Sequence, residues 1–232
     1  MSETPIKLRY KIRSGNDSRI DYSFKDTGEG ITLIHEPPSE DAAWIKLEHE
    51  QCTNCPLDTS THPNCPVAEN LAMLMEDCDK TISYEQVELE VITQQRTISA
   101  QTSAQKALSS LLGLIMATSD CPHTDFFRPM AQFHLPLATR EETTYRAIST
   151  YLLTQYMKHS EGQTVDYDLD GLAEIYKKMH TVNVCMNKRI KSAIDSDTAL
   201  NAVVILDILA ITLPNYLTEE LNNLKPYFSK LL

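Results

Sequence analysis

The spacing of apolar residues changes once along this chain, and that change restricts the fold more than any other feature. In residues 6–100, apolar and polar residues alternate in short runs, which is the period of strands with one buried face. From Thr102 onward, apolar residues recur every three or four positions, which is the period of amphipathic helices. Strands followed by helices predict an α+β fold.

The clearest strand covers residues 6–12, where four apolar residues alternate with basic ones. Turn residues at 14–17 and a second alternating run at 20–24 predict a β-hairpin. Side chains on the wet face of the first strand are predicted to pair with Glu88 and Glu90. Further strand-like runs extend the hairpin into an antiparallel sheet: 31–35, 45–48, 87–91 and 96–100.

Two capping-box patterns predict helix starts in the second half, Thr102 with Gln105 and Thr139 with Glu142. Apolar stripes then predict helices over 107–116, 145–156 and 172–190, and a last helix from residue 218 to Pro226.

The run Ala199–Leu213 has almost no polar face, so it is predicted at the centre of the helical bundle. It is too short and too polar to cross a bilayer. Asp207 within it needs a partner, and a structural hydrogen bond is favoured.

We therefore expect an N-terminal antiparallel sheet, residues 1–100, to pack on a C-terminal helical bundle, residues 101–232. The two parts are predicted to form one compact unit. A Cys-Pro-rich loop and a short helix at 50–80 are predicted at their junction.

The composition excludes some classes of function. The chain has 232 residues and a formal net charge of -11, so nucleic acid and anionic membranes are poor partners. Residues 1–11 lack the apolar core of a secretion signal, which predicts a cytoplasmic protein. In the cytosol six cysteines are expected to stay reduced, which favours metal or redox chemistry over disulfides.

Cys55, Cys65 and Cys121 each precede a proline. Proline is favoured at the first position of a helix, so Cys65 and Cys121 are predicted at N-caps. Backbone N–H groups and the helix dipole favour a thiolate there, and the thiolate is the form that binds metal.

The pair Cys52 and Cys55 can chelate one ion from a tight loop, and Cys65 and Cys121 would complete a tetrahedral set. A local alternative replaces Cys121 by His62. Zinc is the preferred metal, and an iron–sulfur cluster ranks below it because the ferredoxin cysteine spacing is absent. The alternative to both is that these are ordinary buried cysteines without a metal. Cys78 and Cys185 lie in apolar helical surroundings and are predicted to be packing residues.

Residues 119–136 are rich in chemically active side chains, including Cys121, His123, Asp125 and His134, with three phenylalanines among them. This segment is either an aromatic-walled polar pocket or a connection between helices with core phenylalanines. His134 is predicted to be a satisfied, half-buried histidine.

Two segments carry a family resemblance: CTNCPLDTSTHPNCPVAENL at 52–71 and TSAQKALSSLLGLIMATSDCPHTDFFRPMAQFH at 102–134. In them the sequence resembles an uncharacterised bacterial protein family that carries a domain of unknown function. The resemblance implies a bacterial cytosolic origin and a single-unit architecture. It implies no activity and no functional residue.

Two functions fit these residues. The first is a metal-binding regulatory or interaction protein, with a protein partner, in which zinc pins residues 50–66 to the helices. The second is a zinc- or iron–sulfur-dependent enzyme or redox protein that uses the same thiols with His123 and Asp125. A metal with four protein ligands would indicate a structural site, and a metal with an open coordination position would indicate a catalytic one.

Overall fold

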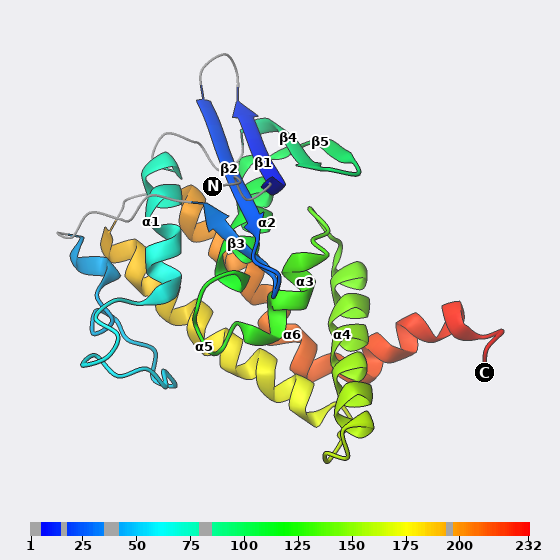
Figure 1. The fold of residues 1–232 in the computed structure, drawn as a ribbon. Coiled ribbons are helices and arrows are strands. Elements are labelled where there is room, and N and C mark those ends of the chain that lie inside the picture. Colours follow the sequence, from blue (N-terminus) through cyan, green and yellow to red (C-terminus); the bar gives the residue numbers. More distant parts are fainter. Residues whose placement is uncertain (1–5, 15–17, 35–41, 79–84, 194–196) are drawn as a thin grey trace.

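The computed structural model describes residues 6–14, 18–34, 42–78, 85–193 and 197–232. Its N-terminal part is a five-stranded antiparallel sheet in the order β3-β2-β1-β4-β5 (Figure 1). The strands are β1 (Ile6–Ser14), β2 (Ser18–Asp26), β3 (Ile31–Ile34), β4 (Gln86–Thr93) and β5 (Thr97–Ser103). The predicted hairpin and short edge strand are confirmed.

Alternation along β1 buries one face of the sheet and leaves the other to ion pairs. Tyr10 lies opposite Tyr22 and Val91, and all three are buried. On the other face basic residues of β1 pair across the strands, as predicted. The ion pairs are Lys7–Asp26 at 3.2 Å, Arg9–Asp21 at 2.7 Å, Lys11–Glu90 at 4.0 Å, Arg13–Glu88 at 3.8 Å and Arg13–Glu90 at 3.6 Å.

Helices make up most of the C-terminal part, so the α+β prediction is confirmed. They are α1 (Pro66–Cys78), α2 (Ala104–Ala117), α3 (Arg128–Gln132), α4 (Arg140–Ser160), α5 (Asp170–Ala193) and α6 (Asp197–Leu224), with short 3-10 turns η1 (Ala43–Ile45), η2 (Asp125–Phe127) and η3 (Lys225–Phe228). Helix α2 lies between the sheet and the other long helices (Figure 1). Buried side chains of the sheet, α1, α2, α5 and α6 form one continuous core.

The predicted strand at 45–48 is wrong. This stretch forms η1 and a single bridge between Lys46 and Asn64. The carbonyls of Trp44, Lys46 and Leu47 accept hydrogen bonds from Arg189 on α5, so they are not used in a strand ladder.

The two predicted capping boxes have different outcomes. Thr139 and Glu142 form one at the start of α4, as predicted. The pattern at Thr102 and Gln105 does not, because β5 continues through Ser103 and Ser103 becomes the N-cap without a side-chain bond.

Helix α6 differs from the prediction in two ways. It is one helix that includes Pro214, but it bends by 91° between Asn215 and Leu217, so the last segment starts one residue before the predicted position 218 and ends just before Pro226. Asn215 Nδ2 donates to the Ile211 carbonyl beside the proline, at 2.8 Å. The second difference is that one side of α6 is not buried in the bundle, since Val204, Ile208 and Ile211 are each about half exposed.

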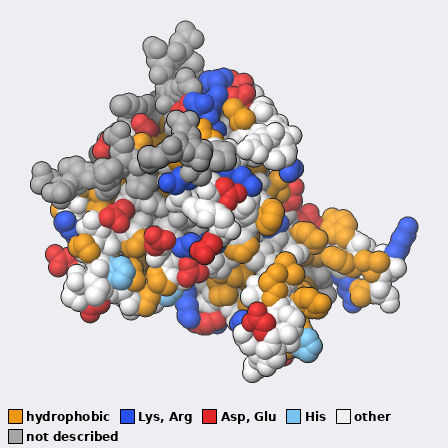
Figure 2. Space-filling view, viewed as in Figure 1, with side chains coloured by type: hydrophobic (Ala, Val, Ile, Leu, Met, Phe, Trp, Pro, Cys, Tyr) orange, Lys and Arg blue, Asp and Glu red, His pale blue; other side chains and the backbone are white. Residues whose placement is uncertain are grey.

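Exposed apolar side chains also gather over α4 and the C-terminal residues (Figure 2). In the described part of the chain, no single helix has the length and apolarity to cross a membrane. The bent pair Ala199–Asn215 and Leu217–Phe228 meets that test only when its two halves are counted together.

Asp207 of α6 has the structural partners that the sequence requires. His180 Nδ1 lies 2.8 Å from its carboxylate, and Asn183 Nδ2 donates to it at 3.1 Å. These contacts tie α5 to α6.

The capping box of α4 gives a direct test of the fold. Thr139→Ala removes the hydroxyl that accepts the Glu142 N–H, so we expect the free energy of unfolding to fall by about 1 kcal/mol in a urea titration. Thr139→Ser keeps the hydroxyl and serves as the control. Equal stability of the two variants would contradict the cap.

Candidate functional site

Five of the six cysteines come together in the fold. Burial raises the pKa of Cys52, and the thiols of Cys185, Cys65 and Cys121 raise it further. Cys55 in turn raises the pKa of Cys65 and Cys121. We call Cys52, Cys55, Cys65, Cys121 and Cys185 the thiol cluster. It joins the loop 46–65, the turn after α2, and α5.

Cys65 is the N-cap of α1, as predicted. Its sulfur accepts backbone hydrogen bonds from Ala68 and Val67. Burial raises the pKa of Cys65, and the Ala68 N–H, the charge of Arg189 and the Val67 N–H act in the opposite direction. The site therefore contains groups that stabilise a thiolate although water is excluded.

Cys121 starts a turn rather than the predicted helix, and η2 follows at Asp125. Its sulfur still accepts backbone hydrogen bonds from His123 and Thr124, as an N-cap would. Burial nevertheless raises the pKa of Cys121 to about 11, so the free thiol is neutral at physiological pH.

Arg189 supplies a buried positive charge beside the cluster. The residue is 1% exposed, and its guanidinium donates to the carbonyls of Trp44 and Lys46 at 2.6 Å and of Leu47 at 3.2 Å. Within the described residues it forms no ion pair with a carboxylate. A buried cation of this kind favours negative charge nearby, and Cys65 is the group whose pKa it lowers.

The loop between Cys52 and Cys55 is attached to two other segments. His123 Nε2 lies 2.7 Å from the Asn54 carbonyl, and Asn54 Nδ2 donates to the Lys178 carbonyl of α5 at 3.1 Å. These bonds hold the Cys-x-x-Cys turn against both the Cys121 turn and α5.

A family model described as Domain of unknown function (DUF6901) matches residues 6–229. The chain belongs to the DUF6901 family. This confirms the predicted resemblance to an uncharacterised family. No curated protein and no solved structure matches the chain.

Some predicted residues of the DUF6901 chain do not join the cluster. His62 is exposed, and its Nδ1 lies 2.9 Å from the Thr61 hydroxyl. Asp125 pairs with Arg128 at 3.0 Å on the surface. Cys78 lies near Tyr22, whose pKa it helps to raise, and is a core residue as predicted.

The thiols do not have the close geometry of a filled metal shell. Among the residues that the structure describes, no three His, Cys, Asp or Glu side chains are grouped tightly enough to hold a metal ion as they stand.

Sequence reasoning missed Cys185 and Arg189. Cys185, predicted as a packing residue, hydrogen-bonds with Cys52 and is part of the cluster. The two missed residues are four positions apart on α5 and therefore share a helix face. An arginine inside the apolar stripe of this helix was the signal that could have pointed to the site.

Arg189 gives a test of the loop's attachment. Arg189→Met leaves the Trp44 and Leu47 carbonyls without this donor, at a cost of about 1–3 kcal/mol each. We expect the free energy of unfolding to fall by at least about 2 kcal/mol in urea. The exposed neighbour Lys188 provides the control Lys188→Met, and equal stability of both variants would contradict this role.

Proposed function

We propose that this DUF6901 protein is a metal-binding regulatory or interaction protein whose thiol cluster forms a structural metal centre. One observation carries the proposal: the four cysteines predicted as ligands from sequence lie near one another although Cys121 is far along the chain. Cys65 and Cys121 raise the pKa of Cys52, and Cys55 raises the pKa of Cys65 and of Cys121. Thiolates from separate segments are the usual ligands of structural zinc.

The charges around the cluster support a bound cation. Burial raises the pKa of Cys52, Cys65 and Cys121, so without a metal these thiols are neutral. A soft divalent cation would displace their protons. The complex of one Zn²⁺ with four thiolates carries two net negative charges, and Arg189 with the N–H groups at Cys65 and Cys121 would compensate them.

Closing the shell requires small movements. A cysteine sulfur is placed by a single side-chain torsion, so new rotamers alone can bring neighbouring sulfurs toward a shared centre. The loop backbone is already held by Arg189, His123 and Lys178. We therefore propose that metal binding reorients thiols on a prepared backbone.

Zinc is the proposed metal, and an iron–sulfur cluster is the alternative with the same ligands. Four cysteines fill either shell. His62 is the weaker fourth ligand because it lies on the exposed side of the loop.

A structural role fits the site better than a catalytic one. A nucleophilic cysteine needs a low pKa, whereas burial raises those of Cys52, Cys65 and Cys121. His123 and Asp125, the proposed catalytic partners, are already bonded to Asn54 and Arg128. The metal would fix the loop 46–65 to the turn after α2 that carries Cys121, and its binding energy would become folding energy.

Metal content and stability should fall together. We expect anaerobically purified protein to contain one equivalent of zinc, or to show visible sulfur-to-iron absorption if it holds a cluster. Cys55→Ser should lose the metal and melt at a lower temperature, because an incomplete shell no longer stabilises the folded state.

Cys78→Ala is the matched control, since it removes a buried thiol outside the cluster and should keep the metal. A parent protein without metal would refute the centre. A metal-free Cys55→Ser protein that melts like its parent would refute the structural role and favour a metalloenzyme.

The fifth thiol separates two ligand sets. With Cys52, Cys55, Cys65 and Cys121 as ligands, Cys185→Ala should keep one equivalent of metal, measured by mass spectrometry of the native protein. Loss of metal in Cys185→Ala but not in Cys121→Ala would show that Cys185, and not Cys121, is the fourth ligand.

The contact between Cys52 and Cys185 favours a second candidate, a redox protein. An oxidant of the disulfide class would take two electrons and two protons from the pair and leave a disulfide between them. Oxidised glutathione added to metal-free protein should then yield a Cys52–Cys185 crosslink in peptide mapping. Its absence would remove this candidate.

A further inference from the structure

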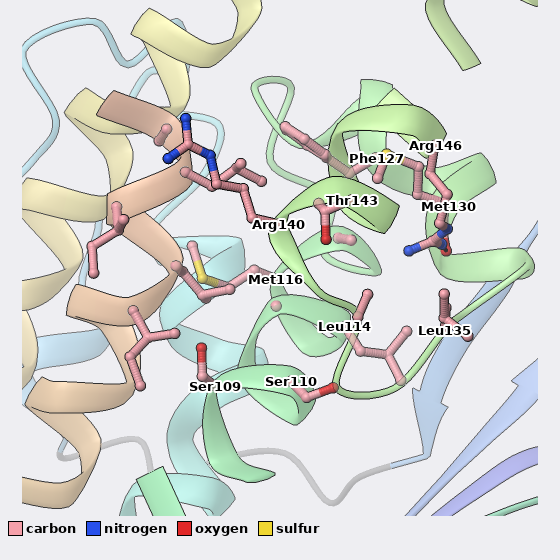
Figure 3. Close-up of a pocket in the computed structure, with 18 of the residues that line it drawn as sticks. Ser109, Ser110, Leu114, Met116, Phe127, Met130, Leu135, Arg140, Thr143 and Arg146 are labelled. Atoms are coloured by element: carbon pink, nitrogen blue, oxygen red, sulfur yellow. Dashed lines mark hydrogen bonds between the residues drawn. The ribbon is translucent and has the colours of Figure 1, made fainter. Parts of the chain in front are cut away.

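A cavity of about 640 Å³ lies beside α2. Its walls come mainly from α2, α5, α6, the start of α4, and the segment from Phe127 to Thr139. In Figure 3, Phe127, Met130 and Arg146 lie together at one end, while Arg140 extends toward α6. Pockets of this size hold small organic molecules.

The walls are mainly apolar. Leu114 and Met116 of α2 line it together with Leu206 and Leu209 of α6, and Phe127 and Met130 lie at one end (Figure 3). Such a lining favours the apolar body of a ligand.

The charged groups at the cavity are all basic. Lys106, Arg140 and Arg146 line it, and none of its lining residues is Asp or Glu, in a protein with a net charge of -11. Arg140 is neutralised by an ion pair with Glu220. The cavity therefore favours an anion over a cation.

Arg146 is the basic residue best placed to bind that anion. Its Nη2 donates to the carbonyls of Met130 at 2.5 Å and Phe133 at 3.0 Å. These two bonds fix the guanidinium at the cavity wall. Within the described part of the protein it forms no salt bridge, although the Glu142 carboxylate is near enough to oppose the lowering of its pKa by burial.

Tyr176 places an unused donor near Arg146. The residue is 3% exposed, and its hydroxyl has no hydrogen-bond partner among the residues that the structure describes. Tyr176 and Arg146 are close enough to interact electrostatically, and both line the cavity. A buried hydroxyl without a partner is unfavourable, and an anion accepting its proton would relieve that cost.

His134 adds no competing charge. Burial and the Arg146 guanidinium lower the pKa of His134 to about 3, so it is neutral. Its Nε2 lies 3.1 Å from the Tyr10 hydroxyl, which also contacts Ser110 at 2.7 Å. The Leu137 N–H donates to the same Ser110 oxygen, so this wall of the cavity is anchored to the sheet.

We propose that the cavity binds an amphipathic monocarboxylate, with its apolar body between α2 and α6 and its carboxylate accepting hydrogen bonds from Tyr176 and Arg146. The site shares no cysteine with the thiol cluster and does not depend on the proposed metal. A carboxylate oxygen suits both donors, because each bond is strengthened by the negative charge.

Decanoate and decanol are suitable probes, since they share an alkyl chain and differ in the charged head. Calorimetric titration of the full-length protein, below the micelle concentration, should show one decanoate per chain and at least about tenfold weaker binding of decanol. Equal affinity for the two probes, or no binding of decanoate, would overturn the proposal.

Tyr176→Phe is the most informative variant because, in the described part of the free protein, the hydroxyl has no hydrogen-bond partner. Its stability without ligand should equal or exceed that of the parent, while its affinity for decanoate should fall about tenfold or more. The exposed Tyr156 of α4 provides the control Tyr156→Phe, which should bind like the parent. Unchanged affinity in Tyr176→Phe would remove the carboxylate subsite.

A larger side chain that fills the cavity tests whether decanoate binds there. Thr143 lines the cavity, and Thr143→Phe should abolish decanoate binding if the folded variant keeps the parent's circular dichroism spectrum. Should Thr143→Phe fail to fold, Ser109→Leu on the opposite wall tests the same point. Undiminished binding in a folded, filled variant would place decanoate elsewhere and refute the site.

Discussion

The buried guanidinium of Arg189 is the interaction on which the cysteine-rich part of this protein depends. It gathers three carbonyls of the 44–47 stretch onto α5 and so fixes where the following loop begins. Its charge also faces Cys65 and opposes the effect of burial on that thiol. One side chain thus shapes the loop and sets the electrostatics of the thiol cluster, because a buried cation must be both hydrogen-bonded and near negative charge.

The segment after α2 connects the two candidate sites. Cys121 belongs to the thiol cluster, and a few residues later Phe127 and Met130 line the cavity. The sequence left two interpretations of this segment open, a pocket or a helix connection, and the structure contains elements of both. A metal held at Cys121 would brace the start of the segment, so the two proposals are separate in chemistry but adjacent in the fold.

The sequence predictions were correct where a structure depends on residues near one another in sequence, and they failed where it depends on distant residues. The strands of the hairpin and the capping box of α4 depend on residues near one another in sequence, and they were predicted correctly. The expected strand at 45–48 failed because Arg189, from a distant helix, takes its carbonyls. Helix α6 includes Pro214 and bends by 91° just after it, because a proline inside a helix removes one hydrogen bond and its ring clashes with the preceding turn.

By itself the sequence determined the α+β layout, the charge pairing across β1 and β4, the start of α1 at Pro66, and four cysteines as candidate ligands, since alternation and proline spacing act locally. Only the tertiary structure decided that Cys185 joins those thiols, that Arg189 lies beside them, and that Tyr176 and Arg146 share a cavity. These arrangements arise where side chains from separate helices meet, and no local pattern encodes which helix faces will be packed together.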